Sequence, residues 1–144
     1  MRISSWLPVV VRVLLGALFV VSGSNKLVPF MAMPPMPEAG TSFLAALAAT
    51  GYFLPLLAIV EVTAGLALIA GRFVPLALVI LAPVVVNIAF FHALLAPSVG
   101  SVVMVVGAEL FLAWHYRAAF VALLRAVPAK SPATWTPSES QRAA

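Results

Sequence analysis

Residues 54–70 form an apolar stretch, LPLLAIVEVTAGLALIA, with one ionisable side chain, Glu61, near its middle. A membrane-spanning helix needs about 20 apolar residues, and the lower limit is roughly 17. A carboxylate at that depth costs free energy unless it faces a protein interior or a wet cavity, with a partner or a proton. We therefore expect the rest of the chain to supply that interior and that partner.

The composition of the 144-residue chain favours lipid as its surroundings, since 64% of the residues are hydrophobic and 8% are charged. A soluble domain has about 25% charged residues. A chain this short with so few charges cannot cover a water-facing surface, so we expect one integral membrane domain in contact with the bilayer. The net charge of +4 comes from Lys and Arg scattered near segment ends. This pattern fits an anionic membrane surface better than nucleic-acid binding.

The chain contains no cysteine, which excludes disulfides, thiol redox chemistry and thiolate metal sites within it. Four-helix membrane oxidoreductases of the vitamin K epoxide reductase type depend on a cysteine pair, so that class is excluded. Met31, Met33 and Met36 lie in a Pro-rich loop, and thioethers suit Cu(I). Only one histidine lies nearby, and Met is also a common filler of apolar loops. We therefore expect no metal site.

Four apolar segments predict an all-α, integral membrane four-helix bundle, with spans at residues 6–27, 53–70, 74–95 and 99–120. The first segment is too long for the core of a signal peptide, contains Arg12 and lacks a convincing cleavage site. Pro83 predicts a kink in the third span, where neighbouring helices can satisfy the freed carbonyl.

The loop at 28–40 is followed by a short apolar segment, FLAALAAT, which is too short to span. We expect it to form an interfacial helix between the first two spans, capped by Thr41 or Ser42 and closed by Gly51. Residues 1–127 are expected to form the single transmembrane domain. Residues 128–144 are polar and rich in Pro and Ser, and are expected to be a disordered cytoplasmic tail.

Four spans place both termini on one side of the membrane. That side collects most of the basic residues, namely Arg2, Arg72, Arg117, Arg125, Lys130 and Arg142. The opposite loops offer only Lys26. Because Lys and Arg favour the cytoplasmic side, we expect both termini to be cytoplasmic.

The polar residues of the spans fall at similar depths. At 1.5 Å per residue, Glu61 and Asn87 each lie roughly 12 Å from the outer end of their helix, and Glu109 roughly 15 Å. The predicted cluster in the outer half of the bundle consists of Ser22, Asn25, Lys26, Glu61, Asn87, His92 and Glu109.

Helical periodicity turns two of these residues toward each other. A stripe with alternating spacings of four and three runs along the first span through Arg12, Gly16, Phe19, Gly23 and Lys26. Glu61 and Gly65 lie on a matching stripe of the second span, and glycines permit close helix approach in lipid. Lys26 and Glu61 are therefore expected to point inward together. His92 lies about 140° around the helix from Asn87, so we expect these two not to face the same neighbour.

Several of these stretches resemble the DoxX family of small bacterial membrane proteins. They are RVLLGALFVVSGSNKL (12–27), EVTAGLALIAGRF (61–73), PVVVNIAFFHALLAPS (83–98) and AELFLAWHYRAAFVALL (108–124). The resemblance implies a four-helix, multi-pass protein of the bacterial inner membrane with both termini inside. Some relatives are associated with a thiosulfate:quinone oxidoreductase and others with oxidative-stress complexes, whereas distant eukaryotic relatives look like cargo receptors or assembly chaperones. Enzyme and accessory protein both stay open.

Two functions follow as hypotheses. In the first, the protein is a membrane subunit or accessory factor of a redox system, and the polar cluster binds a quinone or another small amphiphile. Its partners would be a redox-enzyme subunit or a second copy of the chain. In the second, the cluster only holds the helices together, as interior ion pairs can. A channel or transporter is disfavoured, because four short helices scarcely enclose a path and no repeat of broken helices is present.

Overall fold

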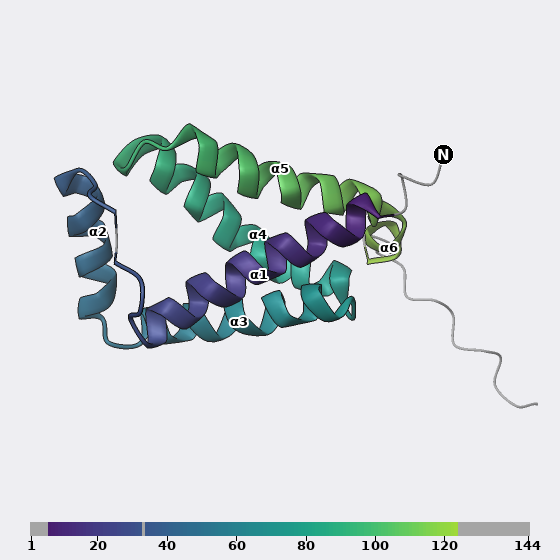
Figure 1. Cartoon of the computed structure of the whole chain (residues 1–144), viewed down its shortest axis with the longest axis horizontal. Coiled ribbons are helices and arrows are strands. Elements are labelled where there is room, and N and C mark those ends of the chain that lie inside the picture. The colour runs from purple at the N-terminus through teal and green to yellow at the C-terminus, as the bar shows by residue number, and fades with distance from the viewer. Residues whose placement is uncertain (1–5, 33, 124–144) are drawn as a thin grey trace, which may run out of the picture.

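The computed structural model describes residues 6–32 and 34–123, and in that part of the chain every regular element is helical. The elements are α1 (Leu7–Leu27), α2 (Glu38–Ala49), α3 (Phe53–Ala70), α4 (Val74–Phe90), the π-helical turn η2 (Phe91–Leu95), α5 (Val99–His115) and α6 (Arg117–Leu123) (Figure 1). The helices α1, α3 and α4 with η2 are long and apolar enough to span a membrane, and α5 is a shorter apolar helix. The predicted all-α membrane bundle is confirmed.

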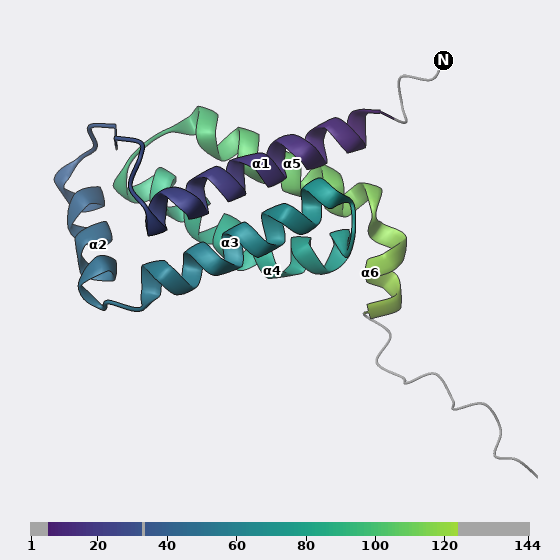
Figure 2. The same ribbon diagram turned by 60° about the horizontal axis from the view of Figure 1, so that its bottom comes forward.

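The helices α1 and α3 lie side by side along most of their length (Figure 2). Gly16 and Gly65 face each other across this contact. A Cβ built on Gly16 would lie 2.6 Å from the carbonyl oxygen of Gly65, and one built on Gly65 would lie 2.7 Å from that of Gly16. Only glycine at both positions permits this approach, as the small-residue packing of membrane helices requires.

The core lies between the four long helices, and its most deeply buried large side chains are Phe19, Leu68, Leu78, Leu81 and Leu112. Each helix also presents large apolar side chains outward, such as Leu56, Leu76 and Leu110. A helix that is apolar on both faces suits a bilayer, where the outer face contacts lipid.

The short helix α2 runs across one end of the bundle (Figure 1). Its predicted start was wrong, because the helix begins at Glu38 and Pro37 occupies the N-cap. Proline at that position has a fixed φ and needs no amide hydrogen bond, so it can begin a helix where the sequence suggested a loop. Thr41 is inside the helix and its hydroxyl donates to the carbonyl of Glu38. Gly51, with φ of 73°, follows the helix as expected.

The helix α3 occupies the predicted range, and its C-cap Gly71 adopts a left-handed conformation with φ of 71°. The guanidinium group of Arg12 packs against Gly71, where a Cβ would collide with it. A cation is favourable at this place, because the C-terminus of a helix carries partial negative charge.

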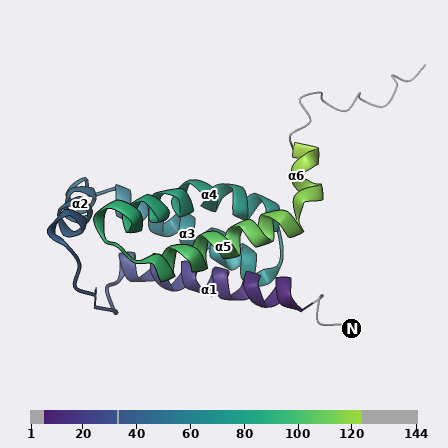
Figure 3. The ribbon, with the colours of Figure 1, turned by 90° about the horizontal axis from the view of Figure 1, so that it is seen from above.

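The last two spans differ from their predicted ranges. The third ends in the π-turn η2 instead of continuing as an α-helix, although Pro83 lies within α4 as expected. The fourth ends at His115, and α6 turns away from the bundle (Figure 3). Arg117 donates to the carbonyl oxygen of Trp114 and its guanidinium lies 5.0 Å from the indole centroid. This capping of the final turn explains why the single helix predicted for 99–120 is two.

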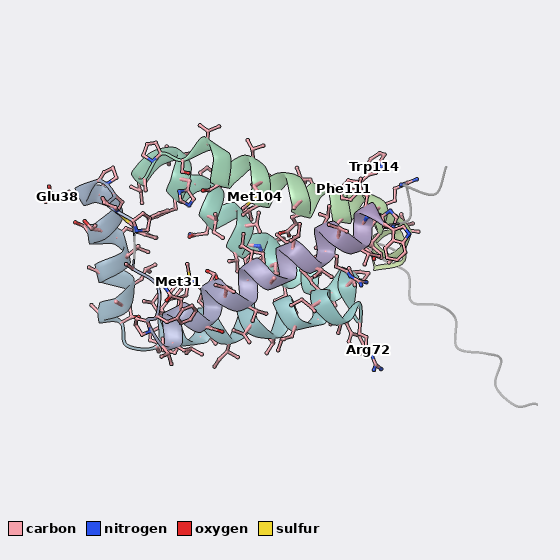
Figure 4. The ribbon with its side chains drawn as sticks, viewed as in Figure 1. Met31, Glu38, Arg72, Met104, Phe111 and Trp114 are labelled. Carbon is pink, nitrogen blue, oxygen red and sulfur yellow. The ribbon has the colours of Figure 1, made fainter. Side chains whose placement is uncertain are left out.

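The two ends of the bundle can be told apart by their residues (Figure 4). Met31 and Glu38 lie at the end covered by α2, hereafter the α2 end, and Arg72 and Trp114 lie at the opposite end. The start of α1 and the helix α6 also lie at the Arg72 end. The predicted tail at 128–144, together with Arg2, Arg125, Lys130 and Arg142, falls outside the described residues.

Candidate functional site

A partly open cavity of about 500 Å³ lies at the α2 end and is lined by residues of every helix except α6. Its walls are largely apolar and come from residues such as Leu18 of α1, Leu57 of α3, Val84 of α4 and Met104 of α5. The polar residues on its walls are Ser22, Lys26, Glu61, Asn87, His92 and Ser101. Five of these six were in the predicted cluster.

An ion pair forms one polar wall of the cavity. Lys26 Nζ lies 2.6 Å from Glu61 Oε2, and it also donates to Ser22 Oγ at 2.8 Å and to the Ser22 carbonyl oxygen at 3.5 Å. The Glu61 side chain is almost fully buried, with 2% of its surface exposed. Since an ammonium has three N–H donors, these partners occupy all the donors of Lys26. Glu61 keeps further acceptor positions on its two oxygens.

Gly23 explains why these two charges can meet. A Cβ built on Gly23 would lie 2.9 Å from the Ala58 carbonyl oxygen and 3.1 Å from the Cβ of Glu61. The glycine therefore lets α1 approach α3 directly opposite Glu61. Lys26, one turn further along α1, then reaches the carboxylate with its long side chain.

Asn87 and His92 lie on the wall formed by α4 and η2, and Ser101 lies on α5. Asn87 and His92 both line the cavity, and the expectation that they do not face the same neighbour stays a prediction. The angle of about 140° assumed an α-helix throughout, whereas His92 lies in a π-turn, whose i to i+5 hydrogen bonds lower the rotation per residue.

His92 is held by a hydrogen bond to the residue that follows η2, where its Nδ1 lies 3.0 Å from the Ala96 carbonyl oxygen. A carbonyl only accepts, so Nδ1 carries a proton in this contact. In the neutral ring Nε2 is then an acceptor. Ser101 Oγ pairs with Ser98 Oγ at 2.9 Å.

The helix α2 supplies one wall of the cavity through Phe43, Leu44 and Leu47. These residues and Ser101 were missed by the sequence reasoning. The spacing of Phe43, Leu44 and Leu47 matches one face of a helix, and this was the available signal. It indicated which side of α2 is apolar but not that this side would cover polar residues of the spans.

Asn25, which we predicted to be in the cluster, is not among the residues that line the cavity, and its side chain binds the loop that follows α1. Its Oδ1 accepts from the backbone N–H groups of Phe30 at 2.9 Å and Met31 at 2.8 Å. Its Nδ2 lies 3.5 Å from the Met31 carbonyl oxygen. The side chain shapes the exit from α1, as Asn commonly does in turns.

Glu109 is also separate from the cavity walls. It lies on the buried stripe of α5 between Val105 and Leu112, and it is 7% exposed. Its Oε2 is buried without a hydrogen-bond partner in the described part of the chain. The depth estimate was misleading because it gives height along the bundle but not direction around the helix axis.

Among residues 6–32 and 34–123, no group of three His, Cys, Asp or Glu side chains is arranged to hold a metal ion. Met33 of the Met-rich loop falls outside those ranges. The cavity offers hydrogen-bond acceptors at Glu61 and His92, an amide at Asn87, and apolar surface elsewhere. This arrangement suits a small ligand with oxygen atoms on an otherwise apolar skeleton.

The model of the DoxX family matches residues 7–94, which cover α1 to most of η2 and hence most of the cavity walls. No curated protein and no solved structure matches the chain.

Proposed function

The chain belongs to the DoxX family, and we propose that it is a membrane subunit or accessory factor of a redox system whose cavity binds a quinone or another small amphiphile. The observation that carries the proposal is the position of the Lys26–Glu61 pair. Both residues line a cavity of about 500 Å³, with 24% of the Lys26 side chain exposed and 2% of the Glu61 side chain. Small-molecule sites typically measure about 300–1,000 Å³ and combine apolar walls with a few polar groups.

The hydrogen-bond donors and acceptors on the cavity walls suit a ligand that has oxygen atoms at both ends of a ring. Glu61 and, in its neutral form, His92 Nε2 accept hydrogen bonds, which suits ligand hydroxyl groups. Asn87 has an amide that can donate to a carbonyl. A quinone offers carbonyl oxygens and its reduced form offers hydroxyls, so this set of side chains can serve either state.

The surroundings of the site fit a protein that works within the bilayer. The outer faces of the spans contact lipid, and we place the protein in the bacterial inner membrane with the Arg72 end in the cytoplasm. Arg72 lies at that end, as does α6, which begins with Arg117, whereas Lys26 lies in the last turn of α1, toward the other end. The partner would be a redox-enzyme subunit or a second copy of the chain.

The alternative is a structural or assembly factor in which the ion pair only fixes two helices. The observation that favours it is that Lys26 joins α1 to the same helix, α3, that the glycine contacts join. Buried ion pairs can specify helix register without any chemistry.

The two functions separate in a comparison of Glu61→Gln with Glu38→Gln in purified protein. Glu38 is an exposed carboxylate at the start of α2, outside the cavity walls. If the site is functional, the wild-type protein and Glu38→Gln bind a quinone analogue, whereas Glu61→Gln does not bind it even at a temperature at which the variant is still folded. Failure of wild-type protein to bind the analogue, together with loss of folding in Glu61→Gln, supports the structural alternative.

A further inference from the structure

A second, smaller hollow of about 180 Å³ adjoins the cavity on the side of α4 and α2. It is lined by Phe43, Asn87, Phe90, Phe91, Leu94 and Leu95. We call it the side groove. Phe43, Asn87 and Phe91 line both the side groove and the cavity. The two spaces are therefore back to back, with shared residues as the partition.

The partition is an aromatic pair. The rings of Phe43 on α2 and Phe91 on η2 are tilted at 41° with centroids 5.8 Å apart. They come from two elements that are separate in the chain, so a small displacement of α2 would part them. Asn87 lies at the same junction and gives it one polar group.

The far side of the groove faces the membrane. Phe90 and Leu94 are 62% and 72% exposed, on a segment apolar enough to span. Large apolar side chains exposed at that place contact lipid acyl chains. The π-turn η2 carries three of the residues that line the groove, Phe91, Leu94 and Leu95, and such turns are frequent at functional sites.

We propose that the cavity binds an amphiphile with a single apolar tail, which passes the Phe43–Phe91 pair and reaches the bilayer through the side groove. The head group then lies beside Glu61 and Lys26, where the polar walls are. The tail remains in apolar surroundings along its whole length, from the groove to the acyl chains, so no part of it is exposed to water. This inference rests on the proposed function and specifies its ligand as a tailed molecule that enters from the lipid side.

The test blocks the groove reversibly with a thiol-reactive reagent. The chain has no native cysteine, so a single introduced cysteine is labelled specifically. In Leu94→Cys, a benzyl methanethiosulfonate adduct places a bulky group at the rim of the groove, since Leu94 lines the groove but not the cavity. Leu110→Cys, at a lipid-facing site on α5 that is 64% exposed, is labelled in the same way as a matched control. Affinity is measured in nanodiscs for a dimethoxy-methyl-benzoquinone with a decyl chain and for the same ring without the chain.

Labelled Leu94→Cys is expected to bind the decyl compound about tenfold more weakly. This loss of affinity corresponds to roughly two methylene groups of the tail that are no longer buried. Binding of the ring alone stays unchanged, and removal of the adduct by reduction restores the original affinity. Leu94→Trp, which needs no reagent, should show the same selectivity. The labelled Leu110→Cys control binds both compounds as before labelling.

The outcomes separate the inference from the function on which it rests. If both compounds bind and the Leu94 adduct weakens neither, or weakens both equally, the ligand site stands and the route through the side groove is wrong. If neither compound binds to the wild-type protein, the proposed function fails and the inference fails with it.

Discussion

Lys26 and Glu61 form the one ion pair found among residues 6–32 and 34–123. Glu61 is 1% exposed and its carboxylate lies 2.6 Å from Lys26 Nζ. Removal of one partner leaves the other charge buried and uncompensated, whereas replacement of both by apolar groups of similar volume is often close to neutral.

Lys26→Met is therefore expected to lower the free energy of unfolding by about 3–5 kcal/mol. The double variant Lys26→Met/Glu61→Leu should recover most of that loss. Unfolding in mixed detergent micelles measures all three variants, with Glu61→Leu alone completing the double-mutant cycle. Additive losses in the double variant would show that the pair is not coupled as its geometry indicates.

The sequence predicted the positions of some side chains correctly and those of others incorrectly. The stripes on the first two spans predicted that Lys26 and Glu61 both point inward, because helical periodicity alone determines which residues share a face. Asn25 and Glu109 were placed by depth, which does not give direction. Asn25 binds the loop after α1, and Glu109 lies on the buried face of α5 away from the cavity walls.

At the level of elements, the contact between α1 and α3 sets the position of the ion pair. Three glycines, Gly16, Gly23 and Gly65, bring the two helices close along this contact. A methyl group at any of them would have to push backbone apart, since the nearest atoms are carbonyl oxygens.

Gly65→Ala should lower the free energy of unfolding by about 1–3 kcal/mol, the usual cost of excess volume in a packed interior. Gly107→Ala is the matched control, because a Cβ there meets nothing within 4 Å. That substitution should be neutral or stabilise the helix by up to about 1 kcal/mol, since alanine is the better helix former. Equal effects of both substitutions on the unfolding curve would contradict the close contact.

The π-turn η2 and the position of α2 over the cavity could not be predicted from the sequence. The ranges of α1 and α3 follow from long apolar runs and from Gly71, and these were predicted to within a residue. The π-turn η2 has no comparable signal, because FHALL is compatible with an ordinary α-helix. The covering of the cavity by α2 depends on tertiary packing between elements that are distant in the chain.

For the whole molecule, the arrangement of charge along the bundle axis gives the expected orientation in the membrane. Arg72 and the start of α1 lie at one end, and α2 with the cavity lies at the other. If the Arg72 end is cytoplasmic, the cavity lies toward the outer surface.

Cysteine accessibility in cells tests this orientation, because the chain has no native cysteine. Met31→Cys should react with a membrane-impermeant maleimide in intact spheroplasts, and Arg72→Cys should react only after lysis. Both positions are exposed. The reverse labelling pattern would show that the protein has the opposite orientation in the membrane. Labelling of both positions in intact spheroplasts would contradict their placement at opposite ends.

The most direct test of the central claim is photolabelling of the membrane-embedded protein with a photoreactive benzoquinone analogue, followed by peptide mapping. Labels are expected on cavity-lining residues from several helices, such as Leu18, Leu57, Val84 and Met104. These labels should disappear in Glu61→Gln and with excess unlabelled analogue. Labels confined to lipid-facing residues such as Leu56, Leu76 and Leu110, and unaffected by Glu61→Gln, would contradict a binding function for the cavity.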